Sequence, residues 1–303
     1  VPSQGGRVRS LRFAGREWLL ALRFTPSAPE WHGYWSNPGD AGQGMRVVLD
    51  LPPGWELGEA RYPVPKRLVI SGLMNHIYEG PYTVLLPVKV PAGADVSAAA
   101  RVTGHVEFLA CTDQICVPQD ALLEAGQGGD LARWRAEVAP LLDARGAFAI
   151  AGQTLRVAIP LPAGVALPDP HLFIGQTKIA EMLDADFAGA QIVRRAGDMV
   201  VFEIPLKPLP PLPDGIAAPP FVPLAEVTGI LSFGDGAGVA FGADPGNVPT
   251  GGEVVAGPKA APVPPLWTLI LGALAGGLLL NIMPCVFPIL SLKAMTLVRA
   301  GDS

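Results

Sequence analysis

The chain has 303 residues, half of them hydrophobic, and a net charge of −5 that arises from only 16% charged residues. No cluster of Lys and Arg alternates with aromatic residues, so the composition argues against nucleic acid as a partner. The 36 Gly and 33 Pro favour short strands and turns over long soluble helices, and the length predicts two domains rather than one.

The chain begins at Val1 with no apolar leader, which indicates either that a targeting segment has been removed or that the sequence starts downstream of one. Alternating apolar and polar residues predict strands, and the clearest strand, residues 101–110, leads directly into Cys111. Further strands are predicted at residues 45–51, 82–88, 154–159, 199–204 and 227–233. We therefore expect a mostly β protein in which pairs of sheets pack as sandwiches.

Cys111 and Cys116 lie five positions apart at the end of the predicted strand. A disulfide that closes so short a loop stabilises a fold by only about 2 kcal/mol, which is little for a structural bond. Redox exchange is the favoured interpretation, and a structural disulfide is the alternative. A metal site is a third reading, but it needs more ligands, and His105 on the same strand is the one nearby candidate. The loop itself contains Asp113 and no Lys or Arg that would stabilise a thiolate.

Asp130 is expected to cap a helix with one apolar stripe, which ends near Gly146. The stripe consists of Leu131, Trp134, Val138, Leu141 and Leu142. After this helix, residues 156–164 resemble residues 46–54, and two shorter matches follow in the same order. These echoes predict a duplicated β domain whose second copy lacks the cysteines.

A Gly- and Pro-rich tether at residues 242–265 precedes a nearly uncharged apolar stretch that is long enough to cross a bilayer, with its C-terminal end in the cytoplasm. Within this predicted span, Pro284 and Pro288 flank Cys285 and interrupt the helical hydrogen bonds. Such a distorted site is tolerated beside protein or a water-filled cavity, so we expect Cys285 to have a function rather than a packing role.

Several motifs together resemble the DsbD/ScsB family of transmembrane thiol:disulfide interchange proteins. In the first half these are residues 31–42 (WHGYWSNPGDAG), 62–67 (YPVPKR), 75–80 (NHIYEG) and 86–88 (LPV). Residues 283–293 (MPCVFPILSLK) resemble the first helix of the electron-carrying membrane domain of that family. The spacing of the soluble cysteines is closer to that in the ScsB-like branch, which is associated with copper tolerance.

The resemblance implies an immunoglobulin-like fold for the N-terminal domain. With the duplication, we expect two immunoglobulin-like β-sandwich domains joined by a short helix and followed by one transmembrane helix. The expected organisation is a redox-active domain at residues 1–125, a linking helix at 126–147 and a second β-sandwich at 148–242. A linker at 243–264 and the first helix of a membrane domain at 265–303 complete it. Residues 1 to about 264 would lie in the periplasm and the remainder in the bacterial inner membrane.

The resemblance also implies a protein-disulfide reductase without a bound cofactor. Cytoplasmic thioredoxin would supply electrons through the membrane portion, in which Cys285 is one exchanging cysteine. Cys116 would form the mixed disulfide with periplasmic thioredoxin-like or disulfide isomerase proteins, and Cys111 would resolve it. Residues 75–80 are expected to cap the cysteines, with Tyr78 as the lid. The alternatives are a membrane-tethered binding module with a structural disulfide and a copper-binding tolerance protein.

Overall fold

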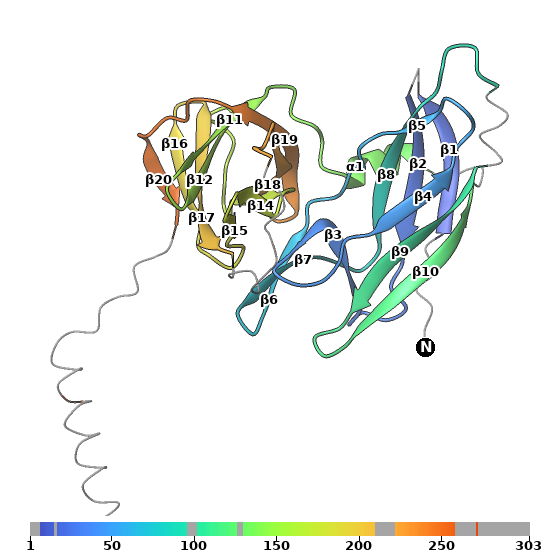
Figure 1. Cartoon of the computed structure of the whole chain (residues 1–303), viewed down its shortest axis with the longest axis horizontal. Coiled ribbons are helices and arrows are strands. Elements are labelled where there is room, and N and C mark those ends of the chain that lie inside the picture. The colour runs from blue at the N-terminus through green and yellow to red at the C-terminus, as the bar shows by residue number, and fades with distance from the viewer. Residues whose placement is uncertain are drawn as a thin grey trace, which may run out of the picture. The chain divides into compact units, whose positions relative to one another are not determined.

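The computed structural model describes residues 7–14, 17–95, 102–125, 130–209 and 222–257, together with Leu271. Residues 1–258 form one compact unit and residues 259–303 a second one. Apart from one short helix, the elements of regular structure among the described residues are all β-strands (Figure 1). The prediction of a mostly β protein is therefore confirmed.

The N-terminal part of the compact unit consists of two antiparallel sheets. The first has the order β1-β2-β8-β5, and its strands are β1 (Arg7–Ala14), β2 (Glu17–Phe24), β5 (Glu56–Leu57) and β8 (Tyr82–Lys89). The second has the order β10-β9-β3-β7-β6, with β4 also paired to β9. Its strands are β3 (His32–Gly39), β4 (Arg46–Asp50), β6 (Lys66–Ile70), β7 (Leu73–Glu79), β9 (Thr103–Cys111) and β10 (Cys116–Glu124).

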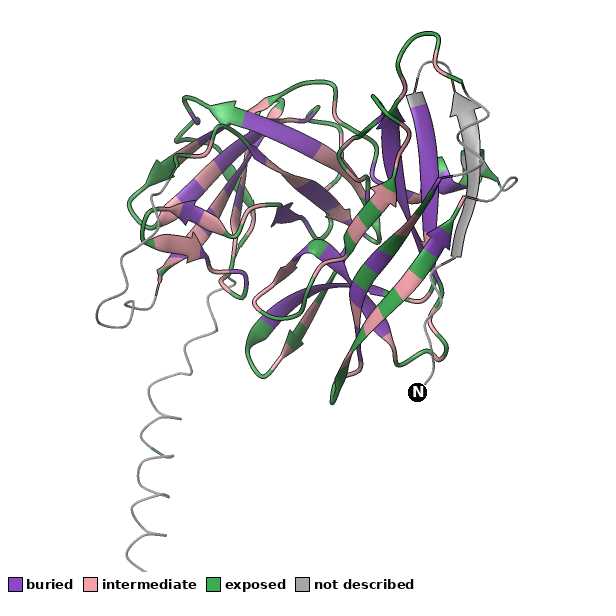
Figure 2. Cartoon of the chain, turned by 45° about the vertical axis from the view of Figure 1, so that its right-hand side comes forward, coloured by how far each residue is buried: buried purple, intermediate pink, exposed green. Residues whose placement is uncertain are grey.

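The main core of this part lies between the two sheets. Leu20 and Leu22 of β2 belong to the same buried cluster as Val106 and Phe108 of β9. On the other face of β9, Thr103, His105 and Glu107 are exposed, which gives the striped burial pattern seen in Figure 2. The alternation predicted for this strand is thus confirmed, because one of its faces packs on the opposite sheet.

Helix α1 (Leu131–Glu137) follows this sandwich and packs against its first sheet. Asp130 caps the helix as predicted, since its Oδ1 accepts a hydrogen bond from the N–H of Arg133 at 3.0 Å. The helix is shorter than the predicted segment because Val138 is already extended. Pro140 then disfavours helical geometry at the residue before it. Trp134 is buried as expected, whereas Leu141 is 69% exposed.

The C-terminal part contains a ten-stranded sheet with the main order β13-β18-β19-β11-β12-β17-β15-β14, to which β16 and β20 are added. The first five strands are β11 (Gly146–Ala151), β12 (Thr154–Pro160), β13 (His171–Ile174), β14 (Lys178–Ala180) and β15 (Leu183–Ala185). The others are β16 (Ile192–Ala196), β17 (Met199–Pro208), β18 (Val227–Gly234), β19 (Ala237–Pro245) and β20 (Glu253–Ala256). Apolar residues from β12, β17 and β18 fill its own core.

One of the shorter matches is Val-Thr-Gly at residues 102–104 and 227–229. In the structure these residues lie at the starts of the hairpins β9–β10 and β18–β19. The longest match, between residues 46–54 and 156–164, falls on β4 and β12. These two strands differ in their partners, because β4 pairs with β9 whereas β12 pairs with β11 and β17. The duplication and the domain boundaries built on it remain predictions.

Polar contacts anchor the end of β3 to the C-terminal part. The side-chain amide of Asn37 donates to the carbonyl oxygen of Ile174 at 2.7 Å. Asp40, whose side chain is almost fully buried, pairs through Oδ1 with the ammonium group of Lys207 at 2.5 Å. Its Oδ2 accepts the N–H of Met74 at 2.9 Å. These contacts fix the strand that lies next to the cysteine-bearing hairpin.

The predicted tether and membrane segment lie almost entirely outside the described residues. In the part of the chain that the structure describes, none of the helices has the length and apolar character needed to cross a bilayer. The transmembrane helix therefore stays a prediction.

Candidate redox site

Cys111 and Cys116 form a disulfide at the tip of the β9–β10 hairpin. The two cysteines are register partners, as the last residue of β9 and the first residue of β10, and their Cα atoms are 4.1 Å apart. Cys111 is 1% exposed, whereas Cys116 is exposed. A partner approaching this end of the sheet would therefore meet the sulfur of Cys116 first.

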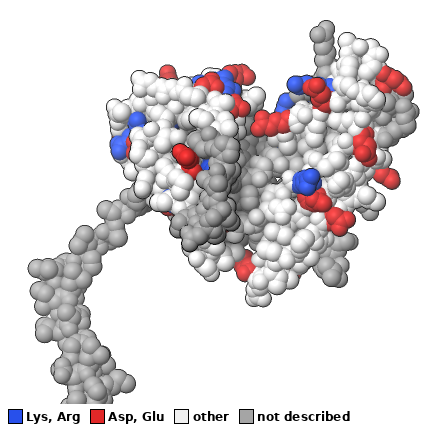
Figure 3. Space-filling view, viewed as in Figure 1, with Lys and Arg blue, Asp and Glu red and all other residues white. Residues whose placement is uncertain are grey.

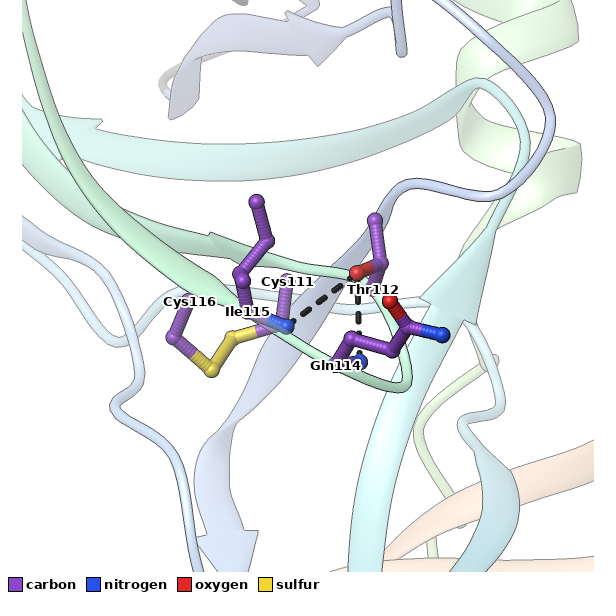
Figure 4. Close-up of a disulfide and its surroundings, with 5 residues drawn as sticks. All are labelled: Cys111, Thr112, Gln114, Ile115 and Cys116. Atoms are coloured by element: carbon purple, nitrogen blue, oxygen red, sulfur yellow. Dashed lines mark hydrogen bonds between the residues drawn. A yellow bond between two sulfur atoms is a disulfide. The ribbon is translucent and has the colours of Figure 1, made fainter.

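The four residues between the cysteines form a tight, hydrogen-bonded turn (Figure 4). The N–H of Thr112 donates to the carbonyl oxygen of Ile115 at 2.8 Å. The Thr112 hydroxyl accepts hydrogen bonds from the N–H groups of Gln114 and Ile115, both at 3.2 Å. One backbone hydrogen bond and two hydrogen bonds to the Thr112 hydroxyl thus hold the turn closed in addition to the disulfide.

Cys111 lies against residues of β3 and β7. It belongs to a buried cluster with Tyr34 and Ile77, and its register partner on β3 is His32. His32 is 4% exposed, and the centroid of its ring is 5.5 Å from that of Tyr34. Neither His32 nor Tyr34 is among the predicted site residues, although both belong to the motif at residues 31–42. Only the pairing of β3 with β9 shows that this motif borders the disulfide.

Electrostatics favour the neutral form of His32. Burial lowers the pKa of His32, while the nearby carboxylates of Asp113 and Glu79 act in the opposite direction to a smaller extent. Burial also raises the pKa of Tyr34, so its phenol stays protonated beside the disulfide. The side chains around Cys111 are thus uncharged, while carboxylates stand at the edge of the site.

The expectation that Tyr78 is the lid over the cysteines is wrong, whereas the cap formed by residues 75–80 stays a prediction. Most of this segment forms β7 inside the second sheet, separated from β9 by β3. Tyr78 is buried in the main core, where its hydroxyl donates to the carbonyl oxygen of Pro63 at 2.9 Å and its ring stacks on Tyr82. Because side chains alternate between the faces of a strand, Ile77 lies on the face of β7 opposite to Tyr78 and belongs to the buried cluster that includes Cys111.

The other predicted supporting residues lie at different distances from the disulfide. Asp113 is exposed in the turn itself. His105 is exposed on β9, six positions before Cys111, and no group of three or more potential metal ligands occurs among the described residues. Cys285, Pro284 and Pro288 lie outside the residues that the structure describes.

Charged side chains do not gather into one large patch on the face seen in Figure 3. Small groups of basic and acidic residues are separated there by wide uncharged areas. Recognition over this face would therefore depend on shape and on apolar or backbone contacts more than on long-range charge attraction.

Comparison with known proteins places these features in a family. The pattern of the family described as "Thiol:disulfide interchange protein DsbD, N-terminal" matches residues 6–127, which include both cysteines of the hairpin. No curated protein matches the chain.

One solved structure shares the fold. The crystal structure of the N-terminal periplasmic domain of ScsB from Proteus mirabilis superposes with a TM-score of 0.54 at 13% identity, over 77% of this chain and 89% of that chain. The YadV chaperone (TM-score 0.16, 8% identity, 80% and 97% covered) and the Pseudomonas aeruginosa CupB2 chaperone (0.17, 12%, 81% and 100%) also match. Their TM-scores are too low to carry an argument. Residues 6–127, which form the cysteine-bearing sheets, are thus similar to the N-terminal domain of the DsbD thiol:disulfide interchange proteins, and the chain shares its fold with the ScsB domain.

Proposed function

We propose that Cys111 and Cys116 form an exchange centre, whose reduced dithiol form reduces disulfides in periplasmic partner proteins and becomes the Cys111–Cys116 disulfide. The observation that carries this proposal is the unequal exposure of the two residues, with Cys116 exposed and Cys111 1% exposed. Disulfide exchange proceeds through one accessible sulfur that forms a mixed disulfide and a second one that resolves it. The hairpin tip offers one cysteine suited to each role.

The electrons would come from cytoplasmic thioredoxin through a membrane portion that includes Cys285, between Pro284 and Pro288. The acceptors would be thioredoxin-like or disulfide isomerase proteins of the periplasm, and no bound cofactor is required because sulfur carries the electrons. This pathway rests on the family and on the motif at residues 283–293. It places residues 1 to about 264 in the periplasm and the following segment in the inner membrane.

A trapping experiment tests the assignment of the two cysteines. Cys111→Ser removes the resolving sulfur and leaves exposed Cys116, so this variant should accumulate mixed disulfides with periplasmic proteins. Cys116→Ser leaves only the buried sulfur and should accumulate far fewer. The measurement is non-reducing electrophoresis after acid quenching of cells, followed by mass spectrometry of the trapped species.

The variant that lacks both Cys111 and Cys116 is the matched control. If neither single variant traps more protein than this control does, the exchange function is contradicted. Titration of the wild-type chain in dithiol buffers gives an independent check. A disulfide that stays oxidised at every potential a periplasmic dithiol protein reaches would favour the binding module with a structural disulfide.

A further inference from the structure

Four side chains with exchange or proton chemistry occupy one row across the second sheet. Glu79 of β7 is the register partner of His32 on β3, His32 is the partner of Cys111 on β9, and Cys111 is the partner of Cys116 on β10. Directly opposed residues of antiparallel strands extend on the same face, with Cβ atoms about 4.5 to 5.5 Å apart. The row therefore places an imidazole beside the buried sulfur of the disulfide and a carboxylate on the far side of that imidazole.

The strands and the turn around His32 all place groups that influence the protonation of its ring. Tyr34 covers the ring from β3, Glu79 faces it from β7, and Asp113 approaches from the hairpin turn. Lys66 of β6 pairs with Glu79 at 2.7 Å and partly offsets that carboxylate. Burial outweighs the two carboxylates and lowers the pKa of His32, so the ring is a neutral base at neutral pH.

The buried sulfur needs such a base. In the reduced chain, the Cys111 thiol would lie among Tyr34 and Ile77, and an apolar site disfavours a thiolate. The residues between the cysteines include no Lys or Arg that would stabilise the charge. Only the thiolate attacks a disulfide, so a group that removes the Cys111 proton would control the step in which Cys111 reacts.

We propose that His32 accepts the proton of the Cys111 thiol when Cys111 resolves the mixed disulfide between Cys116 and a substrate protein. The proposal deepens the exchange function proposed above and rests on it. Glu79 then acts as a positioning residue, because its carboxylate favours the imidazolium that forms.

The step balances in atoms and electrons. The Cys116 thiolate first attacks the substrate disulfide, and one substrate sulfur leaves as a thiolate that takes a proton from solvent. The Cys111 proton then moves to His32, and the Cys111 thiolate attacks the Cys116 sulfur. The Cys111–Cys116 bond forms, the bond from Cys116 to the substrate breaks, and the electron pair leaves with the second substrate sulfur. That sulfur takes up the proton from His32, directly or through water, so two electrons and two protons pass to the substrate.

Single-turnover kinetics with oxidised glutathione as the probe test this role in the whole chain. In the His32→Gln variant, resolution of the glutathione mixed disulfide should slow by about 100-fold at pH 7, a loss of the size typical for general-base catalysis. The difference in the rate of resolution between His32→Gln and the wild type should shrink as the pH rises toward the pKa of a free thiol, because Cys111 then loses its proton without a base. Attack by Cys116, measured in the Cys111→Ser background, should change less than twofold when His32→Gln is added.

His105→Gln is the matched control, because His105 is an exposed histidine on the strand that carries Cys111, and this variant should behave as wild type. Resolution by His32→Gln at the wild-type rate and with the wild-type pH profile would overturn the proposal while the exchange function stands. A wild-type reduced chain that forms no mixed disulfide at all would instead refute the exchange function.

A measurement without any variant guards against a folding defect in His32→Gln. In an NMR titration of the wild-type chain, the ring resonances of His32 should shift when Cys111 ionises in the reduced state. This shift should be absent in the oxidised state, where Cys111 has no proton to lose. If the His32 resonances titrate identically in both states, the proposal is contradicted.

Discussion

Two glycines of the motif at residues 31–42 shape the surroundings of the disulfide. Gly42 has a φ of +98°, and a Cβ atom there would come within 2.2 Å of the Tyr34 ring. A Cβ atom on Gly33 would come within 2.4 Å of the Tyr82 hydroxyl. Because Gly42 has no side chain, the Tyr34 ring can pack close to the backbone there, beside Cys111. Because Gly33 has no side chain, Tyr82 can lie close to β3.

Gly42→Ala should destabilise the chain more than Gly72→Ala does. Gly72 also has a positive φ, +83°, but no atom lies within 4 Å of the position of its Cβ, so alanine there should cost only about 1 kcal/mol. Alanine at Gly42 adds a clash with Tyr34, which should cost about 1 to 3 kcal/mol more. Urea unfolding measures both free energies, and equal costs would contradict the proposed packing of Tyr34.

At the scale of the element, strands β9 and β10 pair along their whole length, with nine register pairs from Cys116–Cys111 to Glu124–Thr103. Its alternation, with Val106 and Phe108 buried and Glu107 exposed, could be predicted from the sequence because it follows from strand geometry alone. The end of helix α1 could not be predicted as accurately, because the backbone already becomes extended at Val138, two residues before Pro140.

Replacement of both cysteines of the hairpin by alanine should cost no more than about 2 kcal/mol of unfolding free energy, since the closed loop is short. The strand pairs and the Thr112 hydrogen bonds remain in that variant, so its circular dichroism spectrum should match that of the wild type. The chemically reduced wild-type chain is the control for loss of the bond without a change of side chain. A variant that fails to fold would point to a structural disulfide.

At the scale of the whole compact unit, the two β parts meet around a buried histidine. The Nδ1 atom of His76 in β7 lies 2.9 Å from the carbonyl oxygen of Asn37, and its ring makes edge contacts with Phe173 and Phe187 of the C-terminal part. Its Nε2 atom is buried and has no hydrogen-bond partner among the described residues. Protonation would thus place a charge in an apolar setting that joins the two parts.

Stability should therefore fall as the pH drops from about 6.5 to 4. Burial lowers the pKa of His76 to about 4, whereas Asn37 and Asp40 oppose this more weakly, so the unfolded chain binds a proton that the folded chain resists. The loss over this range is about 3 kcal/mol for His76, and burial of His171 adds to it in the same direction.

Urea unfolding at pH 7 and at pH 4.5 measures this loss. His76→Gln should reduce the pH dependence, and His105→Gln, which changes an exposed histidine, should leave it unchanged. An unaltered dependence in His76→Gln would show that the charge on this ring does not limit the stability of the compact unit.

The sequence by itself determined the β character of the chain, the strand that leads to Cys111, the cap at Asp130 and the close spacing of the two cysteines. These features depend on local periodicity and spacing, which the order of residues specifies directly. The tertiary structure decided that Cys116 is exposed while Cys111 is buried, that Tyr78 points into the core, and that His32 faces Cys111. The physical reason is that cross-strand neighbours depend on the register between strands that are distant in the sequence. Whether a side chain is buried or exposed depends in addition on which face of its strand another part of the structure covers.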